Sequence, residues 1–393
     1  MQAFINIKGI VIIIILAMSM HYAHAQNRFI DSFNVWNTPA QIRSFQSVAV
    51  RGDAYYFMPV RDRFGAWLSM YKATGDTIYF NVLKNFIDTL IFQAKPSNII
   101  EGSRYAYKDK YEGWIYKTND GKLFGLEVPL SEGYIMRYIF EFVYLAKKYG
   151  VAENNAEWCR KTLLWLTENE WTKWRNRSIR QFGKPNTLFL RERLHMGAHW
   201  AAVALLLNRM TTVDSIKEQT KSVVEQYDLL AKRGFIKNTV DTNMRAFSQT
   251  YNNIKNTDAQ QSTSSFVQDV SHGNHFISYI VLANQLGSEA WGEKEIKKMA
   301  NLDKNILYKG DYTFWDLVNG TEDLKRAGNW GNYQADGWLL LDQYDTGLFK
   351  IHSAILDNAN DITKKYGQLF NYRANLALAY ATIHRSPHLL ALQ

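Results

Sequence analysis

Apolar side chains recur at helical spacing along most of this 393-residue chain, and only six prolines interrupt the pattern. Between residues 63 and 72, for example, Phe64, Trp67, Leu68 and Tyr71 form one stripe. Strand-like alternation is sparse, so the spacing predicts an all-α protein. The ranges with this spacing are 63–72, 79–92, 131–150, 156–170, 188–208, 214–233, 275–286, 290–307, 333–343 and 370–384.

Many of these helices are apolar on two sides, so each needs neighbours on both sides. Paired helices that close into a ring bury such helices, and we predict an (α/α) toroid barrel of six or seven helical hairpins. A superhelical array of helix pairs is the alternative, although no short sequence repeat is visible. Helices of the same style run along the whole chain, so residues 26–393 are predicted to form one domain.

Two stretches interrupt the helices. The range 99–124 is rich in tyrosine, lysine and glycine, and we interpret it as a loop that covers substrate, with a structural Ω-loop as the alternative. Its candidate substrate-contacting residues, chosen by composition, are Arg104, Tyr107, Lys110 and Trp114. The range 239–265 is rich in Asn, Thr, Gln and Ser and is predicted to be a long surface connection.

The first 25 residues have the pattern of a secretory signal peptide. Lys8 precedes an apolar run, and Ala23-His24-Ala25 is a small-x-small cleavage site. The apolar run is shorter than the roughly 20 residues of a membrane-spanning helix, which disfavours the alternative of a membrane anchor. The sequence therefore predicts a protein exported to the periplasm or secreted, without stable membrane insertion after cleavage.

The cysteine content bears on how the fold is held together, and the net charge bears on which molecules the protein binds. The chain has a net charge of +9 and a single cysteine, Cys159, so no internal disulfide is possible and the core must hold the fold. A basic exported protein has nucleic acid, anionic lipid and acidic glycans as possible partners, and export makes nucleic acid the least expected. Aromatic residues are 14% of the chain, and such rings also stack on sugars. We predict an acidic polysaccharide as the partner.

A dispersed set of residues in the last third indicates a chemistry. Asn274-His275 is followed by Arg326 and then by Tyr333. Elimination across a 4-linked uronic acid requires a neutralised carboxylate, a base for the C5 proton and an acid for the leaving O4. In glucuronate and mannuronate the C5 proton and O4 lie on the same face, so one tyrosine can serve as base and then as acid.

These residues resemble the catalytic set of the helical-barrel alginate lyases. Polysaccharide lyase family 5 has an Asn-His pair, then an arginine and, seven residues later, a tyrosine, with an aromatic residue between them that Trp330 matches here. In size, export and motif the chain also resembles the glucuronan and mannuronan lyases of polysaccharide lyase family 38. The resemblance implies a lyase without metal or other cofactor. It also implies that Asn274 and Arg326 contact the carboxylate, whereas His275 and Tyr333 handle protons.

Each of these residues also has a structural interpretation. Asn274-His275 could cap a helix that begins near Phe276, because Asn is a favoured N-cap residue. Arg326 could be a solvated charge, and Tyr333 could be a core ring. The catalytic interpretation depends on their occurring together in a basic, helical, exported chain.

Further histidines lie close to this set in sequence or share its pattern. His272 could orient the site or replace His275 in proton transfer, and Asp269 could hydrogen-bond an imidazole and set its tautomer. His195 and His199 are spaced i, i+4 and therefore share a helix face. That spacing suits zinc, contact with substrate or plain packing.

Two other classes of function stay open. An (α/α)-barrel glycosidase needs a pair of carboxylates, and the candidates near the proposed site are Asp316, Glu322, Asp323, Asp336, Asp342 and Asp345. None of them forms a recognisable pair. A non-catalytic glycan-binding protein is the third class. The sequence does not distinguish among uronans or between internal and terminal cleavage.

Overall fold

The computed structural model describes residues 28–104, 107, 109–118, 121–149, 155–190, 193–237, 245–247, 267–323, 330–358, 368–386 and 388–392. The predicted signal peptide, most of the predicted connection 239–265, and Arg326 lie outside the described residues. None of the helices in the described ranges has the length and apolarity of a membrane span.

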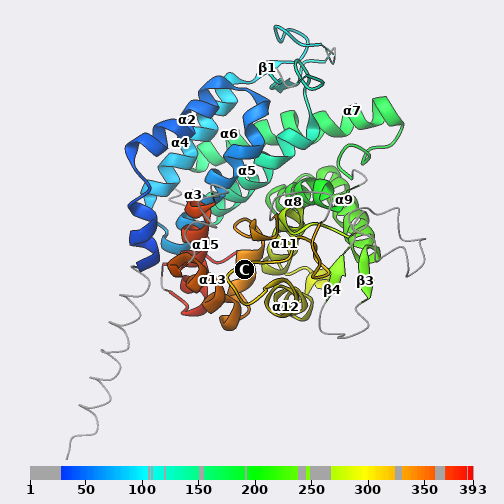
Figure 1. Ribbon diagram of the computed structural model, residues 1–393. Coiled ribbons are helices and arrows are strands. Elements are labelled where there is room, and N and C mark those ends of the chain that lie inside the picture. The colour runs from blue at the N-terminus through cyan, green and yellow to red at the C-terminus, as the bar shows by residue number, and fades with distance from the viewer. Residues whose placement is uncertain are drawn as a thin grey trace, which may run out of the picture.

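The prediction of an all-α protein is confirmed (Figure 1). The α-helices are α2 (Pro39–Arg51), α3 (Phe57–Thr74), α4 (Thr77–Gln93), α5 (Pro129–Tyr149), α6 (Ala156–Leu166), α7 (Lys173–Phe182), α8 (Leu194–Met210), α9 (Asp214–Arg233), α11 (Val270–Gln285), α12 (Glu293–Leu302), α13 (Thr346–Asn358) and α15 (Leu369–Ile383). Short 3-10 helices are η1 (Ala54–Tyr56), η4 (Glu289–Trp291), η6 (Trp330–Asn332) and η7 (Trp338–Gln343). Single π-helical turns, η2 (Thr167–Thr172) and η5 (Asp303–Leu307), follow α6 and α12.

In the part of the chain that the structure describes, strands are confined to two short antiparallel pairs. The first joins β1 (Lys95–Pro96) to β2 (Glu112–Gly113), and the second joins β3 (Phe235–Lys237) to β4 (Arg245–Phe247). The first pair closes the segment 97–111, which includes the first half of the predicted loop 99–124.

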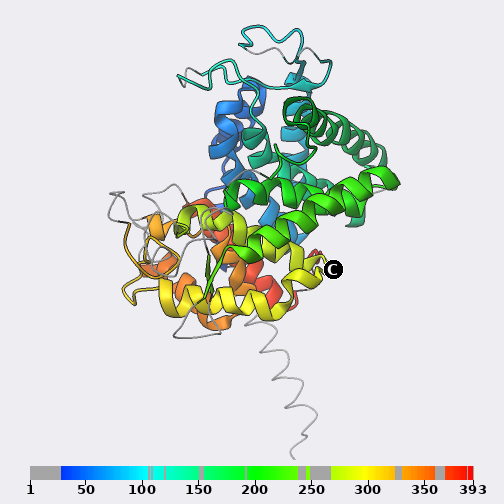
Figure 2. The same ribbon diagram turned by 90° about the vertical axis from the view of Figure 1, so that its right-hand side faces the viewer.

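Successive inner helices pack against one another in a closed circuit. Helix α3 packs on α5, α5 on α8, α8 on α11, α11 on η7, η7 on α15, and α15 returns to α3. Other helices cover this circuit from outside: α4 packs on α3, α9 on α8, and α13 on α15. Helices α2 to α7 occupy the upper part of Figure 1 and α11 to α13 the lower part, an arrangement also visible in Figure 2.

Aromatic residues build much of the core. One cluster of buried hydrophobic side chains includes residues from Phe29 to Leu392. Phe45 stacks on Phe86 with ring centroids 4.3 Å apart, and Trp171 stacks on Phe189 at 4.6 Å. Much of the aromatic content therefore serves packing, and is not by itself a sign of sugar binding.

Two segments differ from the sequence prediction in ways that affect the site. Helix α11 begins at Val270, five residues before the predicted start, because Asp269 is its N-cap and accepts a hydrogen bond from the His272 backbone. Asn274 therefore lies inside the helix, and its interpretation as an N-cap is wrong. The range 333–343 was predicted as one helix, but it contains turns followed by the 3-10 helix η7.

Candidate functional site

Four helices and the segment 330–338 direct polar side chains to one buried centre, which we call the central cluster. Its members are Arg61 and Asp62 on α3, Tyr134, Arg137 and Tyr138 on α5, His195 and His199 on α8, His272 and His275 on α11, and Tyr333 and Asp336. The pairs on α8 and α11, and Tyr134 with Arg137 or Tyr138 on α5, are three to four residues apart and therefore share a face of their helix.

Ring contacts join five of these side chains into a row. The rings of His272 and His195 are 4.5 Å apart, and those of His275 and His199 are 4.6 Å apart. His195 and His275 connect the two pairs at 6.3 Å, and Tyr134 contacts His199 edge-on at 4.6 Å. The predicted histidines therefore do lie together.

Tyr333 lies at the other end of this row. Its hydroxyl donates a hydrogen bond to the Asp62 carboxylate, which also pairs with the Arg61 guanidinium at 3.1 Å. The Arg61 guanidinium lies 4.7 Å from the centre of the Tyr134 ring. One chain of contacts thus runs from the histidines to the phenol.

Burial and neighbouring charges perturb the proton affinities of these groups. Burial raises the pKa of Asp62, and Arg61 only partly offsets that effect. Burial and the Asp62 charge raise the pKa of Tyr333 well above its usual value, whereas Arg61 acts to lower it. The phenol therefore holds its proton at rest, beside a carboxylate with an increased tendency to accept one.

A second carboxylate, Asp336, is more deeply buried than Asp62. It accepts a hydrogen bond from the Tyr138 hydroxyl, and its other oxygen is 3.3 Å from Nδ1 of His275. That short approach lacks hydrogen-bond geometry, so both atoms are buried without a hydrogen bond. Only 2% of His275 is exposed.

The buried histidines are held in the neutral form. Burial, aided by neighbouring cationic groups, lowers the pKa of His199 and His275 well below the usual value, and burial lowers that of His195 to about 3. Both ring nitrogens of His199 are buried and have no hydrogen-bond partner in the described residues. An unsatisfied buried polar group costs stability, which suggests that these imidazoles serve something other than the fold.

His272 differs from the other histidines because its side chain is 33% exposed. Its Nδ1 lies 2.9 Å from the Asp269 carboxylate, as the sequence suggested, and this contact orients the ring. Burial opposes ionisation of Asp269, but the hydrogen bonds from His272 lower its pKa below the usual range.

Asn274 fixes the backbone of the Tyr333 segment. Its amide nitrogen donates to the Ser271 and Tyr333 carbonyl oxygens, and its amide oxygen accepts from the backbone nitrogens of Gly337 at 2.6 Å and Trp338 at 3.2 Å. A side chain at Gly337 would overlap with the Asn274 backbone. Asn274 thus positions Tyr333, and its polar atoms are occupied by backbone groups.

Four side chains in or near the central cluster are partly exposed to solvent. Asp62 keeps 23% of its side-chain surface exposed, Tyr333 is half-buried and His272 is one third exposed. Trp330, at the start of η6, is 37% exposed and lies three residues before Tyr333. Trp330 is therefore a partly exposed aromatic side chain close in sequence to Tyr333.

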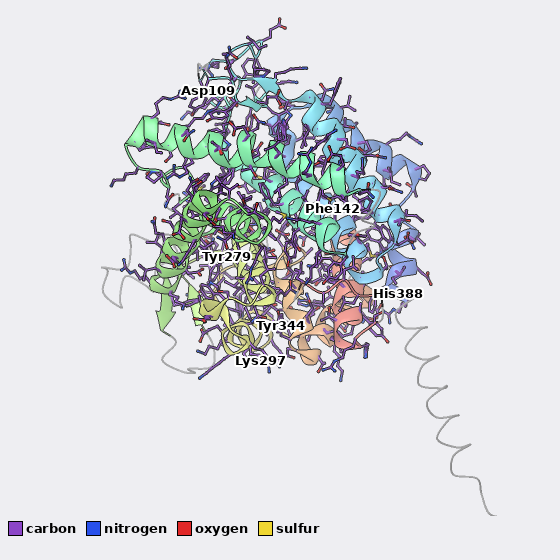
Figure 3. The ribbon with its side chains drawn as sticks, turned by 180° about the vertical axis from the view of Figure 1, so that it is seen from behind. Asp109, Phe142, Tyr279, Lys297, Tyr344 and His388 are labelled. Carbon is purple, nitrogen blue, oxygen red and sulfur yellow. The ribbon has the colours of Figure 1, made fainter. Side chains whose placement is uncertain are left out.

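The residues chosen from the loop 99–124 occupy a different place. Trp114 is buried against Phe57 and donates to the Leu90 carbonyl, so it belongs to the core. Arg104 and Lys110 are exposed, and Arg104 contacts backbone oxygens of its own loop. The loop extends from the upper end of the molecule, where Asp109 marks it in Figure 3.

A network of charges holds this loop on α7, and we call it the loop-base cluster. Its members are Asp109, Glu127, Glu132, Glu170, Lys173 and Arg177. Lys173 is fully buried and lies 2.8 Å from Glu132, while Arg177 pairs with Asp109 at 2.8 Å and with Glu127 at 3.2 Å. The Arg177 guanidinium also lies 3.9 Å from the Tyr107 ring, which places Tyr107 in this network.

Sequence reasoning missed Arg61, Asp62, Tyr134, Arg137 and Tyr138. A signal was present, because Arg61-Asp62 and Arg137 are charges inside otherwise apolar helical stretches. Within the described residues no group of His, Cys, Asp or Glu side chains has the arrangement of a metal site. A cavity of about 430 Å³ beside Cys159 and Val213 contains no central-cluster residue, so chemistry rather than volume identifies the candidate site.

Comparisons of the chain with protein-family models, curated proteins and solved structures found no match.

Proposed function

We propose that this protein is an exported polysaccharide lyase that cleaves a β-1,4-linked uronan, of glucuronate or mannuronate type, by syn elimination. The observation that carries the proposal is the hydrogen bond from the half-buried Tyr333 hydroxyl to Asp62, beside Arg61. A phenol with a carboxylate to receive its proton and a cation to stabilise its charge is suited to abstracting a weakly acidic proton.

In the proposed reaction Tyr333 acts first as base and then as acid. The Tyr333 proton moves to Asp62, and the phenolate removes the proton from C5 of the uronate. The electron pair of the C5–H bond forms the C4–C5 double bond as the C4–O4 bond breaks. Tyr333 then gives its newly acquired proton to O4, and Asp62 returns the first proton to the phenolate. The products are an unsaturated uronate and a chain with a free hydroxyl.

The surrounding residues have distinct parts in this proposal. Arg61 and Arg326 neutralise the substrate carboxylate and stabilise the intermediate, and Trp330 contacts a sugar face. His275 and His272 assist at C5, and the exposure of His272 favours it for direct contact. Asn274 is a positioning residue that holds the Tyr333 backbone.

We further propose that the helices form an (α/α) toroid barrel. The closed circuit of packing from α3 through α5, α8, α11, η7 and α15 supports this arrangement, as do the outer helices that cover it. In such a barrel the central cluster lies where the inner helices converge.

One observation favours hydrolysis as a second candidate. Asp62 and Asp336 both interact with Arg61, and burial raises the pKa of Asp62, as a general acid requires. A glycosidase acting on an acidic glycan would use these two carboxylates. The two reactions differ in their products, since only elimination yields an unsaturated uronate.

The deciding experiment offers the purified, chelator-treated protein glucuronan, polymannuronate, polyguluronate and hyaluronan in turn. Increasing ultraviolet absorbance of the unsaturated uronate establishes elimination and identifies the polymer. New reducing ends without that absorbance assign hydrolysis. Neither signal, with retained binding, indicates a glycan-binding protein.

Replacing Tyr333 by Phe tests the mechanism. Loss of the hydroxyl should reduce kcat by about 10²–10⁴-fold, the usual contribution of general acid–base catalysis, with little change in substrate binding. Circular dichroism and thermal unfolding serve as controls for the fold. A Tyr333→Phe protein that turns over normally would refute the assignment.

A further inference from the structure

A surface groove lies between α2 and the start of α3. It has a volume of about 240 Å³ and is lined by Ser44, Ser47, Val48, Arg51, Tyr56, Pro59, Val60 and Arg63. We call it the α2–α3 groove. None of these lining residues belongs to the central cluster.

The groove contains positive charge without paired carboxylates. Within the described residues, neither Arg51 nor Arg63 forms an ion pair. The Arg51 guanidinium covers the Tyr56 ring at 5.1 Å, and Nη1 of Arg63 donates to the Ser44 hydroxyl at 3.0 Å. Nζ of the exposed Lys117 donates to the Arg51 carbonyl at 2.8 Å, which adds a third cation beside the groove.

Some exposed cations elsewhere are neutralised locally, and others, such as Arg43 and Lys350, are exposed but lie outside the groove. Arg160 pairs with Glu157, and Lys297 pairs with Glu293 within one helical turn. Two carboxylates lie near the groove in sequence, and both have other partners. Asp62 directly precedes Arg63 but pairs with Arg61 and accepts from Tyr333. Asp53 is buried, and backbone nitrogens and the Thr118 hydroxyl donate to its oxygens. The groove therefore attracts an anion that the described chain does not supply.

The shape and chemistry of the groove restrict which anions could bind there. Arginine forks bind carboxylate and sulfate groups, and the serine hydroxyls provide hydrogen bonds to neighbouring sugar hydroxyls. Pockets for drug-sized ligands measure roughly 300–1,000 Å³. Because this groove is smaller than that, at about 240 Å³, it suits a single sugar ring. We propose that the α2–α3 groove binds one anionic unit of an acidic polysaccharide, as a site separate from the central cluster.

Such a site would tether the polymer to the molecule. Arg63 directly follows Asp62, so the groove and the central cluster use the same turn of α3. A polymer held at one point raises the local concentration of its other units at the second point. The inference depends on charge in the groove and does not require that the central cluster be a lyase.

Calorimetric titration of the full-length Tyr333→Phe protein tests this site without cleavage of the ligand. The probes are a uronate trisaccharide, a sulfated oligosaccharide and a neutral oligosaccharide of equal length. The test variant adds Arg51→Ala and Arg63→Ala, and a matched control adds Arg43→Ala and Lys350→Ala, which remove two exposed charges outside the groove.

Losing two charge-assisted contacts should weaken binding of the anionic probe by about tenfold or more, whereas the control should bind like its parent. Tighter binding of the uronate assigns a carboxylate, and tighter binding of the sulfated probe assigns a sulfate. Equal weakening in both variants, unchanged affinity in the groove variant, or equal binding of the neutral probe overturns the proposal.

Turnover separates this inference from the proposed function. With the natural Tyr333, the Arg51→Ala/Arg63→Ala protein should retain kcat on a short uronate oligomer and lose efficiency only on long polymer. A protein without elimination activity but with groove-dependent binding would leave this inference standing and refute the lyase. An active lyase whose groove variant binds and cleaves polymer normally would refute this inference alone.

Discussion

The central cluster and the loop-base cluster are both buried sets of charged and polar groups, yet they are built in opposite ways. In the loop-base cluster the cations Lys173 and Arg177 lie among carboxylates at ion-pair distances. Both oxygens of Glu170 are buried without a hydrogen bond there too, but Lys173 lies 3.9 Å from one of them. In the central cluster both nitrogens of His199 are buried without a hydrogen bond, and Asp62 remains partly open to solvent. The first arrangement stabilises a loop, and the second leaves polar groups available to a ligand.

The largest expected effect comes from breaking the loop-base cluster. Lys173→Met leaves Glu132 buried without its cation, and breaking one partner of a buried pair costs about 3–5 kcal/mol. Urea denaturation should show this loss in the free energy of unfolding. Lys184→Met, which removes an exposed charge just beyond α7, is the control and should have little effect.

Asn274→Ala should have the next largest effect, because it leaves the backbone nitrogens of Gly337 and Trp338 without their acceptor. Unsatisfied buried donors of this kind should cost at least about 2 kcal/mol. Turnover should also fall, since Tyr333 loses its anchor. Asn284→Ala, in the same helix, removes hydrogen bonds to Trp291 and Tyr344 and should destabilise the protein while leaving kcat unchanged.

The two clusters also predict opposite responses to pH. As pH falls below about 6.5, an unfolded histidine gains a proton that His195, with its pKa lowered to about 3, does not. The unfolded state then binds more protons, so acid destabilises the central cluster. Burial and Glu132 raise the pKa of Glu170, so above about 4.5 the folded state keeps a proton that the unfolded state has lost, and rising pH destabilises the loop-base cluster.

Each such group contributes a slope of about 1.4 kcal/mol per pH unit within its window. Glu170→Gln should flatten the alkaline side of the stability profile, and His195→Leu should flatten the acid side. Free energies of unfolding measured across pH check both effects. If Glu170→Gln changed only the acid side, the assignment of the protonated carboxyl would be wrong.

The smallest effect on stability is expected at His199. His199→Leu removes two buried nitrogens that have no hydrogen-bond partner, so the free energy of unfolding should change by under about 1 kcal/mol. Turnover should nevertheless fall, because His199 contacts both His275 and Tyr134. If the variant were less stable but turned over normally, His199 would serve the fold, as Lys173 does, and not the reaction.

Local pattern was a good guide where a helix packs by one apolar face. The range 214–233 was predicted from its spacing and is observed as α9 with those bounds. The range 333–343 has helical spacing too, but the Asn274 side chain binds its backbone and Gly337 allows a close approach, so tertiary contacts replace the helix. A partner about sixty residues away is not visible in a window of local sequence.

In the candidate site, too, local patterns were recognisable from the sequence and long-range contacts were not. Histidines at helical spacing were recognisable, and they do lie together. Asp62 was not recognisable as the partner of Tyr333, because nothing local links two residues so far apart. Composition also cannot give the direction of a side chain, and Trp114 of the aromatic loop points into the core.

The hydrogen bond between Asp62 and Tyr333 joins residues 271 positions apart in the chain. Individual helices form in about a microsecond, whereas closure of so long a loop carries a large entropic cost and delays contacts of this range. A refolding chain would regain its helices well before Tyr333 meets its carboxylate. Recovery of activity during refolding would then indicate that α3 and the Tyr333 segment have packed together. A chain that has its helices but lacks this contact would be inactive toward its substrate.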